Sequence, residues 1–199
     1  MQNSQRPGVF GAWTMTLALA LAVGSPAGRA APQAADAPPA GIVTGTWQHH
    51  KATFSYYGVT TLYTCDGLEG QVGQILRHLG ARKDVQVSAR GCPGPYTPSQ
   101  TAWVDADFYT LAPAAGASGP GTVDARWTPV EVTIQRPSFM GQGDCELIQE
   151  MKDLITQNFS LRGIEYRTEC VPHEYIQDSF SIKGQALTVL PQAGRPLPG

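Results

Sequence analysis

The sequence predicts an α+β fold built from two tandem β-α-β-β repeats with approximate two-fold symmetry. Its helices are expected to pack on one face of an antiparallel or mixed sheet, because each predicted element has a single apolar face to bury. In both copies a tryptophan precedes a cysteine by 18 residues, and a second cysteine follows after 27 or 25 residues: Trp47, Cys65 and Cys92, then Trp127, Cys145 and Cys170. Self-similarity at a fixed spacing indicates a duplicated unit.

The first repeat is expected over residues 46–112. The first strand of this repeat is predicted by comparison with the second copy, where Val130, Val132 and Ile134 alternate with polar residues as in a half-buried strand. The same offsets place His50 on the inward side of the first strand, with His49 facing water. A helix is predicted over 66–79, since leucine, isoleucine and valine recur on one helical face at Leu68, Val72, Ile75, Leu76 and Leu79. Strands are then expected over 84–91 and 101–111.

The second repeat is expected over residues 126–190 and has the same order of elements. A helix over 145–159 carries an apolar stripe at Leu147, Ile148, Met151, Leu154 and Ile155. Strands are expected over 163–169 and 179–190. Residues 113–125, rich in small residues, are predicted to be the linker between the copies.

The first 30 residues have the pattern of an export signal. The apolar run 13–23 is too short to span a bilayer, and small residues allow cleavage after Ala27 or Ala30. Residues 31–45 and 191–199 are predicted to be disordered, because they are rich in alanine and proline or in proline and glycine. The mature protein is therefore expected in the periplasm or outside the cell, with no membrane span.

Export determines how the four cysteines are interpreted, because an oxidising compartment favours disulfides. Of the three possible pairings, the duplication favours Cys65 with Cys92 and Cys145 with Cys170, since each copy then closes its own bridge. A cysteine at the start of a helix can also be a reactive thiolate. That alternative is weaker, because no histidine accompanies either cysteine at a repeated offset.

Composition argues against nucleic-acid binding. The chain has 16 acidic and 14 basic residues, and no cluster of lysine or arginine that could neutralise phosphates. No cofactor-binding motif is present, and neither is a serine-hydrolase or zinc-protease motif. We therefore expect no cofactor, and the partner is an unknown protein or small molecule.

Two polar patterns could still carry chemistry. Asp105 and Asp107 share one face of a predicted strand, about 7 Å apart, which is close to the spacing of the acids of inverting glycosidases. Such alternation is far more often the pattern of a solvated strand face. His49 and His50 could bind a metal, but adjacent strand residues point to opposite faces and cannot easily hold one ion together.

Aromatic residues are concentrated in the first repeat. Tyr56, Tyr57, Tyr63 and Trp103 have no aromatic counterparts in the second copy. Copies that serve only the fold should stay alike, so a difference between them indicates an added role. These four rings are the predicted ligand-binding surface, although some of them could pack the core instead.

Residues 60–70 (TTLYTCDGLEG) and 79–82 (LGAR) resemble exported proteins of Gram-negative bacteria that have no characterised activity. The resemblance covers mainly residues 47–92 and implies export without implying a reaction. The sequence thus favours an exported, non-catalytic binding or interaction protein. An enzyme using Asp105 and Asp107 and a metal-handling protein using His49 or His50 are the alternatives.

Overall fold

The computed structural model of the chain describes residues 41–94, 96–116, 118–134, 136–141, 143–169 and 179–190. The helices and strands follow the chain as β1 (Val43–Tyr57), α1 (Cys65–His78), β2 (Gln86–Arg90), β3 (Thr101–Pro113), β4 (Thr122–Thr133), α2 (Asp144–Asn158), β5 (Leu161–Thr168) and β6 (Phe180–Val189). All of them belong to one unit, residues 38–199. The predicted signal segment, most of the lead-in and the tail lie outside the described residues.

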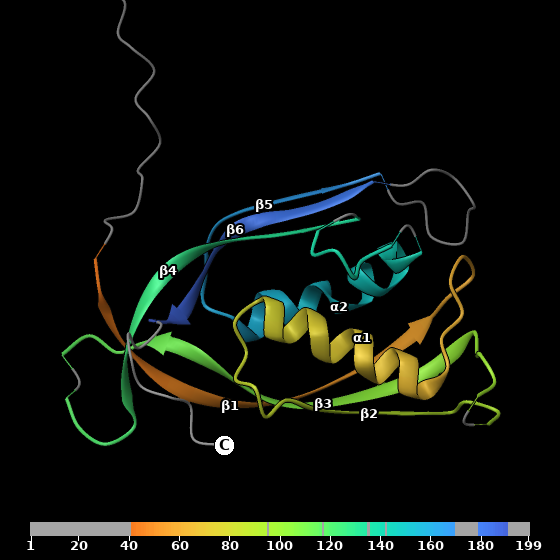
Figure 1. The fold of residues 1–199 in the computed structure, drawn as a ribbon, viewed down its shortest axis with the longest axis horizontal. Helices are drawn as coiled ribbons and strands as arrows, with labels where there is room; N and C mark the ends of the chain where they lie inside the picture. Colours follow the sequence, from red (N-terminus) through yellow and green to blue (C-terminus); the bar gives the residue numbers. More distant parts are fainter. Residues whose placement is uncertain are drawn as a thin grey trace, which may run out of the picture. The chain divides into compact units, whose positions relative to one another are not determined.

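The strands form one antiparallel sheet in the order β2-β3-β1-β4-β6-β5. The sheet joins the two halves of the chain through a short pairing, in which residues 43–46 of β1 lie opposite 122–125 of β4. The rest of β1 pairs with β3, from Gly45 opposite Pro113 to Tyr57 opposite Thr101. Figure 1 shows both helices between the β2-β3-β1 half and the β4-β6-β5 half of this sheet. The predicted α+β class is confirmed.

Both helices bury the apolar stripes that the sequence predicts. The stripe residues of α1 and α2 are almost fully buried and share one core with inward residues of the strands, including Val104, Phe108, Val132 and Ile182. Thr64 caps α1, because its Oγ1 accepts a hydrogen bond from the Gly67 amide at 3.0 Å. Three glycines lower the helix propensity of α1, so burial of its apolar stripe in the core stabilises this helix more than its intrinsic propensity does.

The predicted boundaries differ from the observed ones where pairing between distant segments decides the structure. β1 begins at Val43, inside the segment predicted to be disordered, and β4 begins at Thr122, inside the predicted linker. These two segments pair with each other. Neither has a strong alternating pattern of its own, so the pairing and not the local sequence makes them strands.

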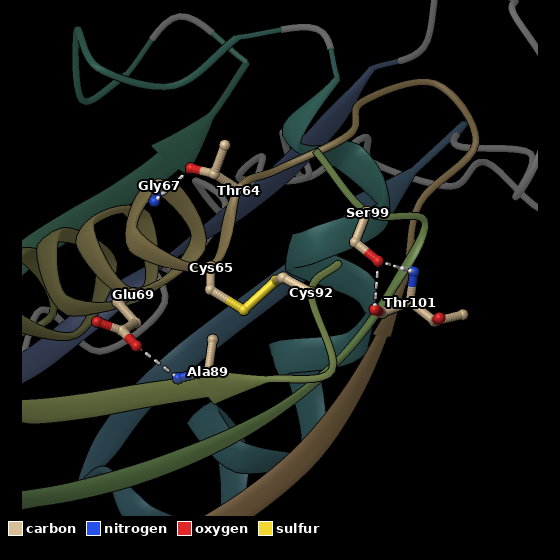
Figure 2. The surroundings of a disulfide bond; sticks show 8 residues. All are labelled: Thr64, Cys65, Gly67, Glu69, Ala89, Cys92, Ser99 and Thr101. Carbon is tan, nitrogen blue, oxygen red and sulfur yellow. Dashed lines mark hydrogen bonds between the residues drawn. A yellow bond between two sulfur atoms is a disulfide. The ribbon is translucent and has the colours of Figure 1, made fainter. Parts of the chain in front are cut away.

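A disulfide joins Cys65, at the start of α1, to Cys92, just after β2. This confirms the first predicted bridge. Figure 2 shows a second contact between α1 and β2 beside the disulfide: the Glu69 carboxylate of α1 accepts a hydrogen bond at 2.8 Å from the backbone amide of Ala89 in β2. Because β2 is an edge strand, this contact covers an amide that would otherwise be open to pairing. The partner predicted for Cys145, Cys170, lies outside the described residues, so that bridge stays a prediction.

Candidate functional site

The candidate site is the face of β1, β3 and β2 that points away from the helices, which we call the outer face. Strand residues alternate between faces, and the even-numbered residues within 52–56 of β1 and 102–108 of β3 point into the helix-packed core. The strand register arranges the outer face in rows across the three strands. From one end to the other, the rows are Ser55–Trp103–Arg90, Thr53–Asp105–Ser88, Lys51–Asp107–Gln86 and His49–Tyr109.

A groove of about 430 Å³ crosses the middle of this face. Its lining consists of two full rows of the outer face together with the residues between them: Lys51, Thr53, Gln86, Ser88, Asp105, Asp107, Ala52, Val87 and Ala106. Because residues alternate along a strand, the last three contribute backbone to this side. Both carboxylates predicted as candidate acids therefore line one groove.

Each carboxylate in the groove has a basic neighbour. The Asp107 Oδ1 accepts a hydrogen bond from His49 Nε2 at 2.6 Å, and its Oδ2 lies 3.3 Å from the Lys51 ammonium. The hydrogen bond from His49, aided by Lys51, holds the pKa of Asp107 below its ordinary value. The Asp105 Oδ1 accepts a hydrogen bond from the Thr53 hydroxyl at 2.7 Å, and its Oδ2 lies 3.3 Å from the Arg90 guanidinium. The two carboxylates of the groove are thus paired with basic side chains, of which His49 and Arg90 stand in the neighbouring rows of the outer face.

The end of the face beyond Asp107 is closed by stacked side chains. His49 stacks on Tyr109 with ring centroids 4.7 Å apart, and the Arg82 guanidinium lies 3.6 Å from the centre of the same tyrosine ring. Arg82 is fixed in turn by two hydrogen bonds to Asp84, at 2.8 and 2.6 Å. The faces of Tyr109 are therefore already in contact with protein groups.

His50 lies on the opposite side of the sheet from His49. Its Nε2 is 2.8 Å from the Thr110 hydroxyl, and its ring contacts Phe108. Burial is the main reason why the pKa of His50 is below its ordinary value. The two histidines cannot share an ion in this arrangement. Among the described residues, no group of three or more histidine, cysteine or acidic side chains is placed to hold a metal.

The four predicted ligand-binding rings divide into two pairs. Trp103 is 51% exposed and Tyr57 is 44% exposed, and both lie on the outer face. Tyr56 is only 1% exposed and belongs to the core, where its ring meets the edge of the partly buried Tyr63. Two of the four predicted rings, Tyr57 and Trp103, are thus on the outer face, whereas Tyr56 faces the helices and Tyr63 packs against the same core.

The indole of Trp103 packs against Gly91, where any residue with a side chain would force the indole or the backbone to move. A Cβ atom added to Gly91 would lie 2.8 Å from the Cε3 and Cζ3 atoms of the indole, and Gly91 has a φ of +96°. This backbone conformation strongly favours glycine. The next residue, Cys92, is anchored to α1 by the disulfide (Figure 2). One side of the indole is therefore packed on a tethered turn while about half of the side chain stays in solvent.

Tyr56 and Tyr63 take part in a buried polar cluster at the start of α2. The Asp144 carboxylate accepts hydrogen bonds from the Tyr63 hydroxyl, from Gln71 Nε2 at 2.9 Å and from the Gly141 amide at 2.6 Å. Burial nevertheless raises the pKa of Asp144 above its ordinary value. The sequence places Asp144 at the start of a helix, but it gives no sign that three donors converge on it.

A second buried carboxylate, Glu146, holds the loop after β1. Its Oε2 accepts hydrogen bonds from the backbone amides of Val59 and Thr60, at 2.8 and 3.2 Å. The Tyr56 hydroxyl donates to the carbonyl of Thr61 in the same loop at 2.6 Å. Burial, together with Glu146 and Asp144, raises the pKa of Tyr56 well above its ordinary value. These groups are all committed to joining the loop to α2, so we assign the cluster a structural role.

A repeated contact lies where the halves of the sheet meet. Arg82 lies over the ring of Trp47 at 5.7 Å, and Arg162 lies over the ring of Trp127 at 3.8 Å. Each arginine follows its tryptophan by 35 residues (82 − 47 and 162 − 127). The equal tryptophan-to-arginine spacing in the two copies is a pattern from which both cation–π contacts could have been predicted.

Comparisons of this chain with protein-family models, with curated proteins and with solved structures gave no match. Within the described residues, no helix is long and apolar enough to cross a membrane.

Proposed function

We propose that this chain is an exported, non-catalytic binding protein, and that it recognises its ligand on the outer face around Tyr57 and Trp103. One observation carries the proposal: the outer face has a groove, with the half-exposed Trp103 one row from it and the half-exposed Tyr57 diagonal to Trp103. Large rings left in solvent at a fixed position are a common device for binding. Sites built on strands also hold their side chains more accurately than sites built on loops.

Export is supported by the amino-terminal sequence and by the disulfide. The short apolar run 13–23 followed by small residues is typical of a cleaved signal. A structural disulfide such as Cys65–Cys92 persists mainly in oxidising compartments. Expression of the full chain in a Gram-negative host, followed by osmotic-shock fractionation and amino-terminal sequencing, tests this. We expect soluble protein in the periplasmic fraction, beginning after Ala27 or Ala30, and an uncleaved cytoplasmic chain would contradict it.

We further infer that the scaffold is a tandem repeat. The order β-α-β-β occurs twice along the chain, and the two halves of the sheet have matching strand orders, β2-β3-β1 and β5-β6-β4. The two tryptophan–arginine contacts at equal spacing support the same inference. Peptide mapping of unreduced protein should find Cys145 linked to Cys170. Linkage of either residue to Cys65 or Cys92 would contradict it.

The enzymatic alternative would use Asp105 and Asp107 in the same groove. Both carboxylates already have basic neighbours, and the lowered pKa of Asp107 makes it a poor proton donor at neutral pH. The metal alternative would use His49, which donates to Asp107, or His50, which faces the core. The contacts of these aspartates therefore do not favour catalysis over ligand binding, and the contacts of these histidines do not favour metal binding over it.

A thermal-shift screen of wild-type protein and Trp103→Ala tests the proposed function. Ligands that bind only the folded state raise the melting temperature, and the rise grows with the logarithm of ligand concentration once this exceeds Kd. We expect at least one ligand that stabilises the wild type and fails to stabilise Trp103→Ala. Ile164→Ala serves as the matched control, because Ile164 is an exposed residue of β5 in the other half of the sheet. If every ligand found stabilises Trp103→Ala as well as the wild type, the proposal is wrong.

A further inference from the structure

We propose that the outer face binds a neutral carbohydrate chain, with Trp103 and Tyr57 packing against sugar rings and the groove residues bonding to sugar hydroxyls. This inference rests on the proposed function and names the chemical class of its ligand. A pyranose ring presents an apolar surface of C–H bonds and a rim of hydroxyl groups. The site must therefore offer an accessible aromatic face beside hydrogen-bonding side chains that carry little net charge.

The aromatic part of the requirement is met at one end of the face. Trp103 stands opposite Ser55, and Tyr57 is two residues further along β1, so the two rings are diagonal neighbours on the same side of the sheet. Because Gly91 supports one side of the indole, Trp103 loses little conformational freedom when a ligand packs on it. A ring held in this way is suited to packing against the apolar face of a sugar ring, where each contact contributes little energy.

The charges of the face select against ions. Lys51 lies beside Asp107 within the groove, and Arg90 lies beside Asp105 from the neighbouring row, so each carboxylate of the groove is paired with a cation of the outer face. A charged ligand would have to break these pairs and would gain little net attraction from the outer face, where the cations of the pairs offset the carboxylates. A neutral ligand can use the same groups as fixed donors and acceptors. Charge complementarity thus favours a neutral polyol over a nucleic acid or a strongly charged peptide.

The groove also supplies the hydrogen-bonding groups and the length. Gln86 and Ser88 point into it from β2, and their side chains have no hydrogen-bond partner in the part of the chain that the structure describes. From Trp103 to Asp107, where the open part of the face ends, is four residues along β3, about 13 Å at the usual rise of a strand. That length matches a short stretch of a polysaccharide better than a single sugar. The ligand is therefore expected to lie across the face as a chain.

Calorimetric titration with defined neutral hexasaccharides tests the inference. The probes are β-1,4-linked glucose, β-1,4-linked N-acetylglucosamine and α-1,4-linked glucose, each at 50 and 500 mM NaCl. We expect at least one probe to bind with the same Kd at both salt concentrations. Trp103→Ala should weaken binding at least tenfold, about 1.4 kcal/mol. Trp103→Phe, which keeps a ring over Gly91, should restore most of the affinity, and Ile164→Ala should leave it unchanged. Circular dichroism confirms that each variant is folded.

A parallel selection with phage-displayed peptides separates the two proposals. If no hexasaccharide binds but a selected peptide binds and depends on Trp103, the carbohydrate inference is overturned and the binding face stands. Affinity that falls steeply with salt overturns the neutral character of the ligand. If neither class shows binding that depends on Trp103, both the inference and the proposed function fail.

Discussion

Replacing Gly91 by alanine should disturb the protein through Trp103. The added Cβ would lie 2.8 Å from two indole carbons, closer than such contacts occur, so the ring or the turn must move. Overpacking of this kind costs about 1–3 kcal/mol. The positive φ of +96° adds a backbone cost of about 1–2 kcal/mol for a residue with a side chain. We therefore expect Gly91→Ala to lower the free energy of unfolding by about 2–5 kcal/mol.

A double-mutant cycle separates the two contributions. In a Trp103→Ala background the indole is gone, so Gly91→Ala should cost only the backbone part, about 1–2 kcal/mol. Urea unfolding followed by circular dichroism gives the four free energies, because this signal does not depend on the deleted tryptophan. If Gly91→Ala costs the same in both backgrounds, Trp103 does not rest on Gly91 and the preorganised ring in our account does not exist.

Three other predictions concern the elements that support the face. Because burial raises the pKa of folded Asp144, the wild type should lose stability as the pH rises above about 4, whereas Asp144→Asn should not. The unfolding free energy of Asp144→Asn minus that of the wild type should therefore increase with pH; a difference that stays constant across pH would contradict this. Tyr56→Phe should cost about 1–3 kcal/mol in urea unfolding, since it leaves the Thr61 carbonyl without its 2.6 Å donor; no measurable cost would refute the role of that hydrogen bond. The double substitution Cys65→Ser, Cys92→Ser should cost about 3–4 kcal/mol, because the bridge closes a loop of 27 residues in the unfolded chain; an equal stability of the variant and the oxidised wild type would show that the bridge is dispensable.

Local sequence patterns were enough to predict most of the elements. The apolar stripes of α1 and α2 and the alternation in β3 have the periods of a helix and a strand, and the observed helices begin within one residue of the predicted starts. The start of β1 was missed, because Val43 and its neighbours become a strand only by pairing with β4. Strand order was also unreadable, since pairing between distant segments leaves no local signal.

The candidate site could be predicted only in part. Alternation alone puts Asp105 and Asp107 on one face, and the contrast between the two copies draws attention to Trp103 and Tyr57. That these residues share a single face with a groove depends on the register of β1 against β3. Tyr56 points inward because it is the strand neighbour of Tyr57 and successive side chains point to opposite faces. The support of Trp103 by Gly91 is a contact between residues 12 apart that no spacing rule marks.

The most direct test of the binding face is NMR titration of ¹⁵N-labelled protein with a ligand from the screen, read at the indole N–H signals. Trp103 lies at one end of the outer face, whereas Trp47 and Trp127 pack in a separate cluster beyond its other end, where the halves of the sheet meet. Our account predicts that the Trp103 indole signal and the backbone amides of 51–57 and 103–107 shift during the titration. The indole signals of Trp47 and Trp127 should stay in place. A ligand that shifts either of those signals and leaves Trp103 unchanged would contradict the account.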